Sequence, residues 1–323
     1  MRIGAAIRSK LDEYFVSVFR DYPVLISVSL VAIWGQMSVA SVNNFALSFY
    51  VLDDLAQPGR VLGYLTSAFL LTETLQKLPF GRLSDRWGRR PFIVAGLTAQ
   101  LALPLVVVAV PPIAFVAAPV LIYVLLIPLR LIGGAASAAV WPPAFAIVPD
   151  EVPRRSRGAG MAVLNSTYSL GIAAGPALGG AVSQLAWRAG RFEWVERAPF
   201  ALAVFAGLVA ITAARFLPAQ APGEAGRRRG RSVLPPARIL AIIAAIAFVE
   251  LFATSSLAPY LAPYMVGVTG ITRPQAGYFL LLLGVPVALL GIPLGRLADV
   301  WPRCQVRQLA LWISALGMWE CPF

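Results

Sequence analysis

The chain has no histidine and only two cysteines among its 323 residues, Cys304 and Cys321. Because these residue types supply most zinc and haem ligands, we expect no metal and no other cofactor. Two cysteines cannot build a disulfide framework, so we interpret both as free thiols. An intramembrane enzyme is also disfavoured, since no acidic pair clusters near a membrane edge to supply general acid and base.

Charge is scarce as well. Charged residues make up 13% of the chain and hydrophobic residues 59%, and the mean hydropathy is +0.75. Such a composition indicates an all-α integral membrane protein. A bilayer core about 30 Å thick needs about 20 apolar residues of helix. About nine segments meet this requirement: 23–50, 61–80, 91–110, 117–148, 158–185, 198–217, 239–266, 275–294 and 305–323.

The basic residues are unevenly distributed along the chain. Of the 27 lysines and arginines, 21 lie in the N-terminal tail and the even-numbered loops. Positive charge favours the cytoplasmic face, so we expect a cytoplasmic N-terminus in a multi-pass protein of the inner or plasma membrane. The net charge of +12 is thereby explained by topology, and nucleic-acid binding is not expected. Residues 1–22 lack a signal-peptide pattern and are predicted to be a cytoplasmic tail.

One long polar interruption divides the apolar segments. Residues 218–238 are rich in proline, glycine and arginine and have no apolar periodicity, which is typical of a flexible cytoplasmic linker. We therefore predict a complete six-helix bundle over 23–217 and a partial bundle of three helices over 239–323.

An internal repeat relates the two bundles. A shift of 214 residues aligns PFGRLSDRWGR (79–89) with PLGRLADVWPR (293–303), with seven of eleven positions identical. Repeated helical units around a central linker are typical of secondary transporters, in which two bundles move about a site near the membrane midplane. The first three helices and the three helices after the linker are thus predicted to be copies of one unit.

The repeated motif resembles the cytoplasmic loop between helices 2 and 3 of the major facilitator superfamily. Two further patterns resemble the same family. One is Arg130 with Gly134, followed by Asp150. The other is GIAAGPALGG (171–180), which is best known in the drug/proton antiporter branch. The residues matched in the loop and its weaker copy are Gly81, Leu83, Asp85, Arg86, Gly88, Arg89, Arg90, Gly295, Leu297, Asp299 and Arg303.

The resemblance implies a conformational latch at this loop. Asp85 would meet the start of helix 11 and Asp299 the start of helix 5, closing the cytoplasmic side. A carboxylate at a helix N-terminus contributes about 0.3 to 2 kcal/mol, depending on burial. A simpler interpretation is a topology anchor, in which Gly81 and Gly88 form a tight turn and the arginines stay in the cytosol.

The family has twelve helices, whereas this chain ends after about nine. We therefore expect a truncated chain that lacks helices 10–12 and does not transport alone. The partner implied for Asp85 would then be missing.

Ionisable groups within the membrane are candidates for substrate and proton binding. Glu73, Arg130 and Glu250 qualify, and the 214-residue shift aligns Glu250 with Gln36. Each side chain also has a structural alternative: an ion pair of Glu73 with Lys77, a hydrogen bond from Arg130 to helix 1, and an interhelical hydrogen bond for Glu250. Polar stripes are predicted on helix 1, with Gln36, Asn43 and Asn44, and on helix 7, with Glu250 and Thr254. Together with Glu73 and Arg130 they form the predicted substrate and proton pathway.

Small residues mark a predicted packing face. The pattern at Gly171, Gly175, Pro176, Gly179 and Gly180 would let another helix approach closely. With the family resemblance, these features favour a secondary active transporter of a small molecule, monomeric, and coupled to protons for efflux. The alternatives are a non-transporting fragment of an interrupted gene and, less favoured, the intramembrane enzyme.

Overall fold

The computed structural model describes residues 22–153, 156–219, 236, 238, 242 and 257–300, with side chains up to Leu290 except at position 287. Within this part, helices form all the regular structure. The first rod comprises α2 (Val24–Ser41), the π-helix η1 (Val42–Ala46), α3 (Leu47–Phe49) and the π-helix η2 (Tyr50–Asp54). The elements that follow are α4 (Gly59–Trp87), α5 (Arg89–Gln100), α6 (Ala102–Ala109), α7 (Pro112–Ala117), the π-helix η3 (Ile122–Leu126), α8 (Ile127–Glu151), α9 (Arg157–Arg188), the short η5 (Phe192–Trp194), α10 (Ala198–Ala214), a helical run over 257–269, and α13 (Arg273–Val300).

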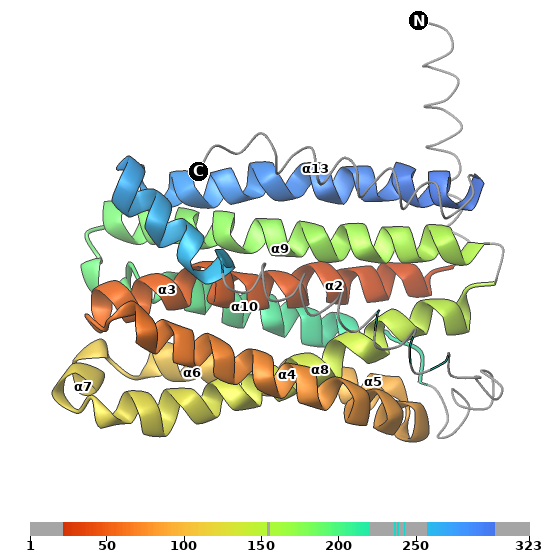
Figure 1. Cartoon of the computed structure of the whole chain (residues 1–323), viewed down its shortest axis with the longest axis horizontal. Coiled ribbons are helices and arrows are strands. Elements are labelled where there is room, and N and C mark those ends of the chain that lie inside the picture. The colour runs from red at the N-terminus through yellow and green to blue at the C-terminus, as the bar shows by residue number, and fades with distance from the viewer. Residues whose placement is uncertain are drawn as a thin grey trace, which may run out of the picture.

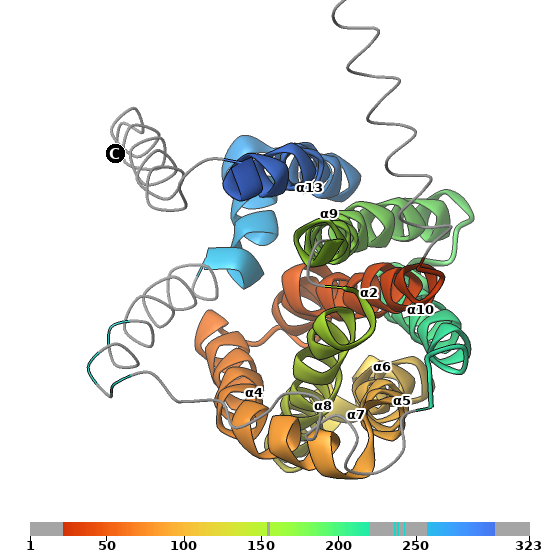
Figure 2. The same cartoon turned by 90° about the vertical axis from the view of Figure 1, so that its right-hand side faces the viewer.

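The rods run side by side and form two groups. Residues 24–214 form six rods close to the first six predicted spans, and we call them the first bundle. Residues 257–300 form the described part of the second bundle. Figure 1 shows α13 next to α9, with α2, α4 and α8 beyond, and Figure 2 shows the same order end-on. The most extensive contacts of the described part join α9 to α13 and to α2, and α4 to α8.

Several helices satisfy the requirements for crossing a membrane. By length and composition, four in the described part qualify: Val24–Asp54, Arg89–Ala109, Ile122–Glu151 and Arg273–Leu290. The 17-residue α10 is apolar but shorter. The long helices α4 and α9 do not qualify, since α4 has a charged last third and α9 is rich in glycine and serine.

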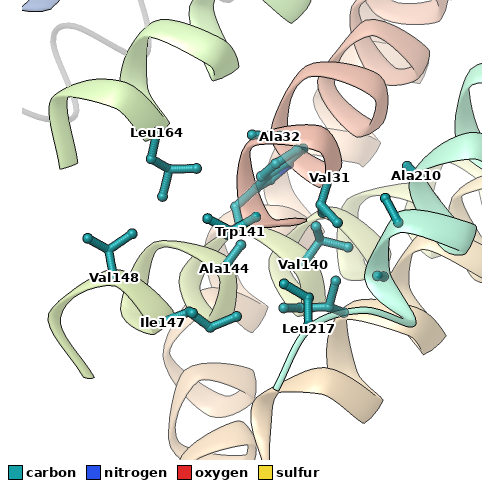
Figure 3. Packing of buried hydrophobic residues seen from close by; sticks show 14 of the residues in the cluster. Val31, Ala32, Val140, Trp141, Ala144, Ile147, Val148, Leu164, Ala210 and Leu217 are labelled. Atoms are coloured by element: carbon teal, nitrogen blue, oxygen red, sulfur yellow. The ribbon is translucent and has the colours of Figure 1, made fainter. Parts of the chain in front are cut away.

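The first bundle has two apolar clusters, one near each end. One joins α2, α5, α8, α9 and α10, and Trp141 of α8 lies in the middle of the side chains shown in Figure 3. The other joins the far ends of the rods around Tyr50, Phe115 and Phe200. The two clusters leave the middle of the bundle for polar side chains.

The predicted turn between the second and third spans is partly wrong. Gly81 lies inside α4, which continues to Trp87, and only Gly88 turns the chain, with φ of 96°. Leucine and arginine favour helix, so the sequence after Gly81 extends α4. The positive φ at Gly88 is a conformation that glycine adopts without steric cost. We call the end of the first bundle that carries this turn the arginine-rich end.

Candidate functional site

Arg130 lies at the centre of a polar network between the two apolar clusters. Its side chain projects from α8 and is 3% exposed. Nε donates to the carbonyl oxygen of Leu65 at 3.1 Å, and Nη1 donates to Oδ1 of Asn43 at 2.7 Å. The guanidinium also lies 4.5 Å from the ring centroid of Phe69. Arg130 is therefore held by helix 1 and helix 2 at once, and the hydrogen bond to helix 1 is the structural alternative given above.

The close approach of α8 to α4 depends on a glycine. A Cβ atom on Gly134 would lie 2.1 Å from the carbonyl oxygen of Phe69, which is far inside van der Waals contact. The missing side chain allows Arg130, one turn away, to reach the carbonyl of Leu65. The pair Arg130 and Gly134, noted in the sequence as a pattern, thus acts as one packing unit.

A small cavity adjoins Arg130. Its volume is about 30 Å³, and its polar lining comes from Ser38, Asn43, Gln100 and Arg130. Nε2 of Gln100 is buried and has no hydrogen-bond partner among the described residues. A cavity needs roughly 10 to 15 Å³ to hold one water, so this one has room for about two. Water here would connect the Arg130 network to α5.

Glu73 forms the second half of the network. Its Oε1 accepts a hydrogen bond of 3.0 Å from Ser137 of α8 and lies 3.3 Å from Nζ of Lys77. The second contact is the ion pair that the sequence offered as an alternative to function. Glu73 is 15% exposed and close enough to Arg130 to interact electrostatically. The two roles can coexist, because a carboxylate oxygen accepts more than one hydrogen bond.

The remaining predicted pathway residues are dispersed or undescribed. Gln36 is 8% exposed and packs against α9, and its Oε1 has no partner in the described part. Asn43 and Asn44 lie in the π-helix η1. Its wider turn changes the register after Gln36, so the predicted stripe is not continuous along helix 1. Glu250 and Thr254 lie outside the described residues.

A second buried network lies at the arginine-rich end. Arg89 is 1% exposed and its Nη2 lies 2.6 Å from Asp150 and 3.3 Å from Asp85. Arg89 is therefore enclosed by the protein and is not exposed to solvent at this end. Two carboxylates from α4 and α8 hold it in the protein, and burial of a charge requires such partners. Of the other predicted latch residues, Arg86 and Arg90 belong to the same α4–α5 turn. The side chain of Asp299 and the whole of Arg303 lie outside the described part.

The glycines of α9 serve two contacts on different faces. Cβ atoms on Gly171 and Gly175 would each lie 2.6 Å from backbone atoms of α2. A Cβ atom on Gly179 would lie 3.2 Å from Phe45 of the same rod. Gly180 instead approaches the start of α13, and the carbonyl of Pro176 would lie 2.5 Å from a Cβ on Gly277. One stretch of small residues thus brings α9 close to both bundles.

Sequence reasoning missed an ion cluster at the end opposite the arginine-rich end. Arg273 of α13 pairs with Glu196 before α10 and, at 2.6 Å, with Asp53 of η2. Burial, with some help from Asp54 and Asp53, raises the pKa of Glu196 to about 7 although Arg273 opposes the shift. One feature of the sequence could have indicated this cluster. Charged residues are scarce in these loops, yet arginine and acidic residues occur in three separate segments there.

The comparisons with known proteins can now be set beside this geometry. The model of the Major Facilitator Superfamily matches residues 28–319. A curated relative, the MFS-type transporter TwmF of Talaromyces wortmannii, is 29% identical over 174 residues, which are 53% of this chain and 29% of TwmF.

Solved structures show the same fold. A bacterial homologue of the human lysosomal transporter Spinster, in an inward-facing and occupied conformation, gives a TM-score of 0.58 at 18% identity, over 84% of this chain and 58% of that one. A D-xylose-proton symporter gives 0.58 at 15% identity, over 86% and 69%. This chain therefore spans less than two thirds of TwmF and of the Spinster homologue. The fold, the two bundles and the family match together establish that this multi-pass membrane protein belongs to the Major Facilitator Superfamily.

Proposed function

We propose that the chain forms part of a secondary active transporter that works by alternating access and exports a small molecule in exchange for protons. The observation that carries this proposal is the buried network of Arg130, Asn43, Glu73 and Ser137. Charged groups within a membrane protein are costly and are typically kept for function. Packing alone would not require an arginine and a carboxylate in the middle of the bundle.

The network supplies the chemistry that coupling needs. Glu73 accepts a hydrogen bond from Ser137 and forms an ion pair with Lys77. When Glu73 takes up a proton, its ion pair with Lys77 is lost and the positive charge around Arg130 rises by one unit. A substrate held near this site therefore gains or loses electrostatic stabilisation with each protonation, so protons and substrate bind in a linked manner.

The latch also belongs to this proposal. Arg89, held by Asp85 and Asp150, fixes the α4–α5 turn to α8 within the first bundle. Asp85 lies on the more exposed side of this network, and 29% of its side chain is exposed. It is therefore placed to release Arg89 and to accept a contact from a neighbouring helix end. Gly171, Gly175 and Gly179 keep α9 against the first rod during such a movement.

Reconstitution tests the proposal directly. The chain is placed in liposomes that contain a trapped pH dye, and proton flux is followed after addition of ethidium, an organic cation, or carboxyfluorescein, an organic anion. Flux that needs one of these probes, and that Glu73→Gln abolishes, is expected. Lys77→Gln is the matched control, because it removes the ion pair but keeps the carboxylate. Probe-driven flux that persists in Glu73→Gln would remove Glu73 from the coupling mechanism, and absence of probe-driven flux in the unmodified chain would show that this part alone does not complete the transporter.

A further inference from the structure

Among the described residues, polar groups of the two bundles meet at one end. In the part that the structure describes, each side-chain hydrogen bond between them lies opposite the arginine-rich end. Ser48 Oγ donates to the carbonyl of Pro259, and Tyr260 Oη donates to the carbonyl of Gly59 at 3.0 Å. Arg273 adds its ion pairs with Glu196 and Asp53. This end is therefore closed in the described conformation.

Arg273 has contacts with three separate parts of the first bundle. Its Nη1 meets Glu196 between α9 and α10, and its Nη2 lies 2.6 Å from Asp53 of η2. The guanidinium also lies 4.9 Å from the ring centroid of Phe49 in α3. An arginine fork suits two carboxylates at once better than a lysine would. Separating the bundles at this end breaks all three contacts together.

An apolar seal accompanies the ion cluster. Phe45 and Phe49 of the first rod pack with Ala262 and Ala276 of the second bundle, and all four are at most 3% exposed. Close approach of α13 to α9 extends the seal, since a Cβ on Gly284 would lie 2.4 Å from Ala173. The apolar contacts are spread over several residues, whereas the ion cluster depends on Arg273 and can be released by a single substitution.

We propose that Arg273, Glu196 and Asp53 form a clamp that holds this end of the transporter closed, and that release of Arg273 permits the end to open. This inference rests on the alternating-access function proposed above. By the distribution of basic residues this is the outer end, so the clamp governs when the site is exposed outside.

The two acids contribute unequally to the clamp. The side chain of Glu196 is 7% exposed, and that of Asp53 is 48% exposed. An exposed pair contributes little, whereas a buried carboxylate that loses its cation is strongly unfavourable until water reaches it. Loss of Arg273 should therefore drive opening mainly through Glu196. Asp54 of η2 and the adjacent Arg197 also lie near Glu196. Arg197 donates to the carbonyl of Val110 at 2.9 Å, and we expect it to keep this partner when Arg273 is replaced.

Cysteine labelling measures the opening without any transport. Ala262→Cys, in a chain with Cys304 and Cys321 changed to serine, places a thiol in the seal, where the alanine is fully buried. A membrane-impermeant maleimide is applied at pH 8 to reconstituted protein of known orientation. Arg273→Gln is expected to raise the labelling rate about tenfold or more, since a lost charge-assisted contact changes an equilibrium by about that factor. Arg191→Gln, which changes an exposed arginine of the same connection, is the control and should leave the rate unchanged.

A second substitution separates the clamp from general loosening. Adding Glu196→Gln to Arg273→Gln removes the stranded carboxylate, so the labelling rate should fall again, whereas Asp53→Asn alone should change it less than threefold. If Arg273→Gln does not fold, Arg273→Lys takes its place in the test, and an intermediate increase in the labelling rate is expected. Unchanged labelling in Arg273→Gln, or in Arg273→Lys where the first does not fold, would overturn the clamp, as would a double variant that labels faster still. Clamp-dependent labelling together with probe-driven flux that persists in Glu73→Gln would refute the proposed coupling and leave the clamp standing.

Discussion

Replacing Gly134 with alanine tests how closely α8 must approach α4. The new Cβ atom would lie 2.1 Å from the carbonyl oxygen of Phe69 and 3.0 Å from the backbone nitrogen of Glu73. Since carbon and oxygen in contact stay more than 3 Å apart, the helices must separate by about 1 Å. Backbone atoms cannot turn aside as a side chain can. Overpacking costs typically 1 to 3 kcal/mol, and we expect at least the upper value here.

The adjacent glycine provides the matched control. A Cβ atom on Gly133 would lie 3.5 Å from the Phe69 ring, which is ordinary contact. Alanine also favours helix over glycine by about 0.5 to 1 kcal/mol. Gly133→Ala should therefore be neutral or slightly stabilising, although the two substitutions add the same methyl group to neighbouring positions of one helix.

Thermal unfolding in detergent, followed by size-exclusion chromatography of the heated samples, measures the difference. Gly134→Ala is expected to lower the Tm by roughly 5 °C or more relative to Gly133→Ala. Gly134→Ala should also weaken the hydrogen bond from Arg130 to Leu65, because Gly134 and Arg130 lie at the same contact between α8 and α4. Equal Tm values for the two variants would show that α8 and α4 are not packed as described.

Three further predictions concern the charged and helix-packing contacts. Arg89→Gln removes the cation that pairs with the buried Asp150 and the half-buried Asp85, and should lower stability by about 3 to 5 kcal/mol in the same assay, whereas Arg90→Gln should change it little; equal effects would contradict the buried network. Because the folded pKa of Glu196, about 7, exceeds its ordinary value of 4.5, the folded protein binds this proton more tightly than the unfolded chain. The stabilisation that protonated Glu196 gives to the folded state is complete below pH 4.5 and is lost as the pH rises to 7. Glu196→Gln should therefore flatten the dependence of Tm on pH across this window, and an unchanged slope would exclude the raised pKa of Glu196. Gly277→Ala, whose Cβ would lie 2.5 Å from a carbonyl of α9, should speed maleimide labelling of the seal, and Gly267→Ala, with no atom within 4 Å of its Cβ, should not.

Much of the fold was predictable because it follows from hydropathy and repetition. The apolar segments, the positions of the first six rods and the family membership all derive from patterns along one chain. The branch assignment and proton-coupled efflux stay predictions. Gly81 was misplaced because a glycine within a polar motif suggests a turn, while its neighbours favour helix.

The candidate site was less predictable because its contacts join distant segments. Periodicity placed Gln36, Asn43 and Asn44 on one stripe, but a π-helical turn at residues 42–46 changes which neighbours they meet. Arg89 looked like an exposed topology signal, and only the fold brings Asp150 within 2.6 Å of it. Sequence spacing gives i, i+4 pairs such as Glu73 with Lys77; it cannot give pairs between rods.

The contact of α9 with α13 has a mechanical consequence. At Gly180, Gly277 and Gly284, the nearest atoms across this contact belong to alanine, to proline or to the backbone. At these points one helix can shift along the other without large barriers, because no side chain has to change its rotamer. The resistance to motion is concentrated in a few charges at the rim, and a change to those charges alone would alter how fast the molecule cycles.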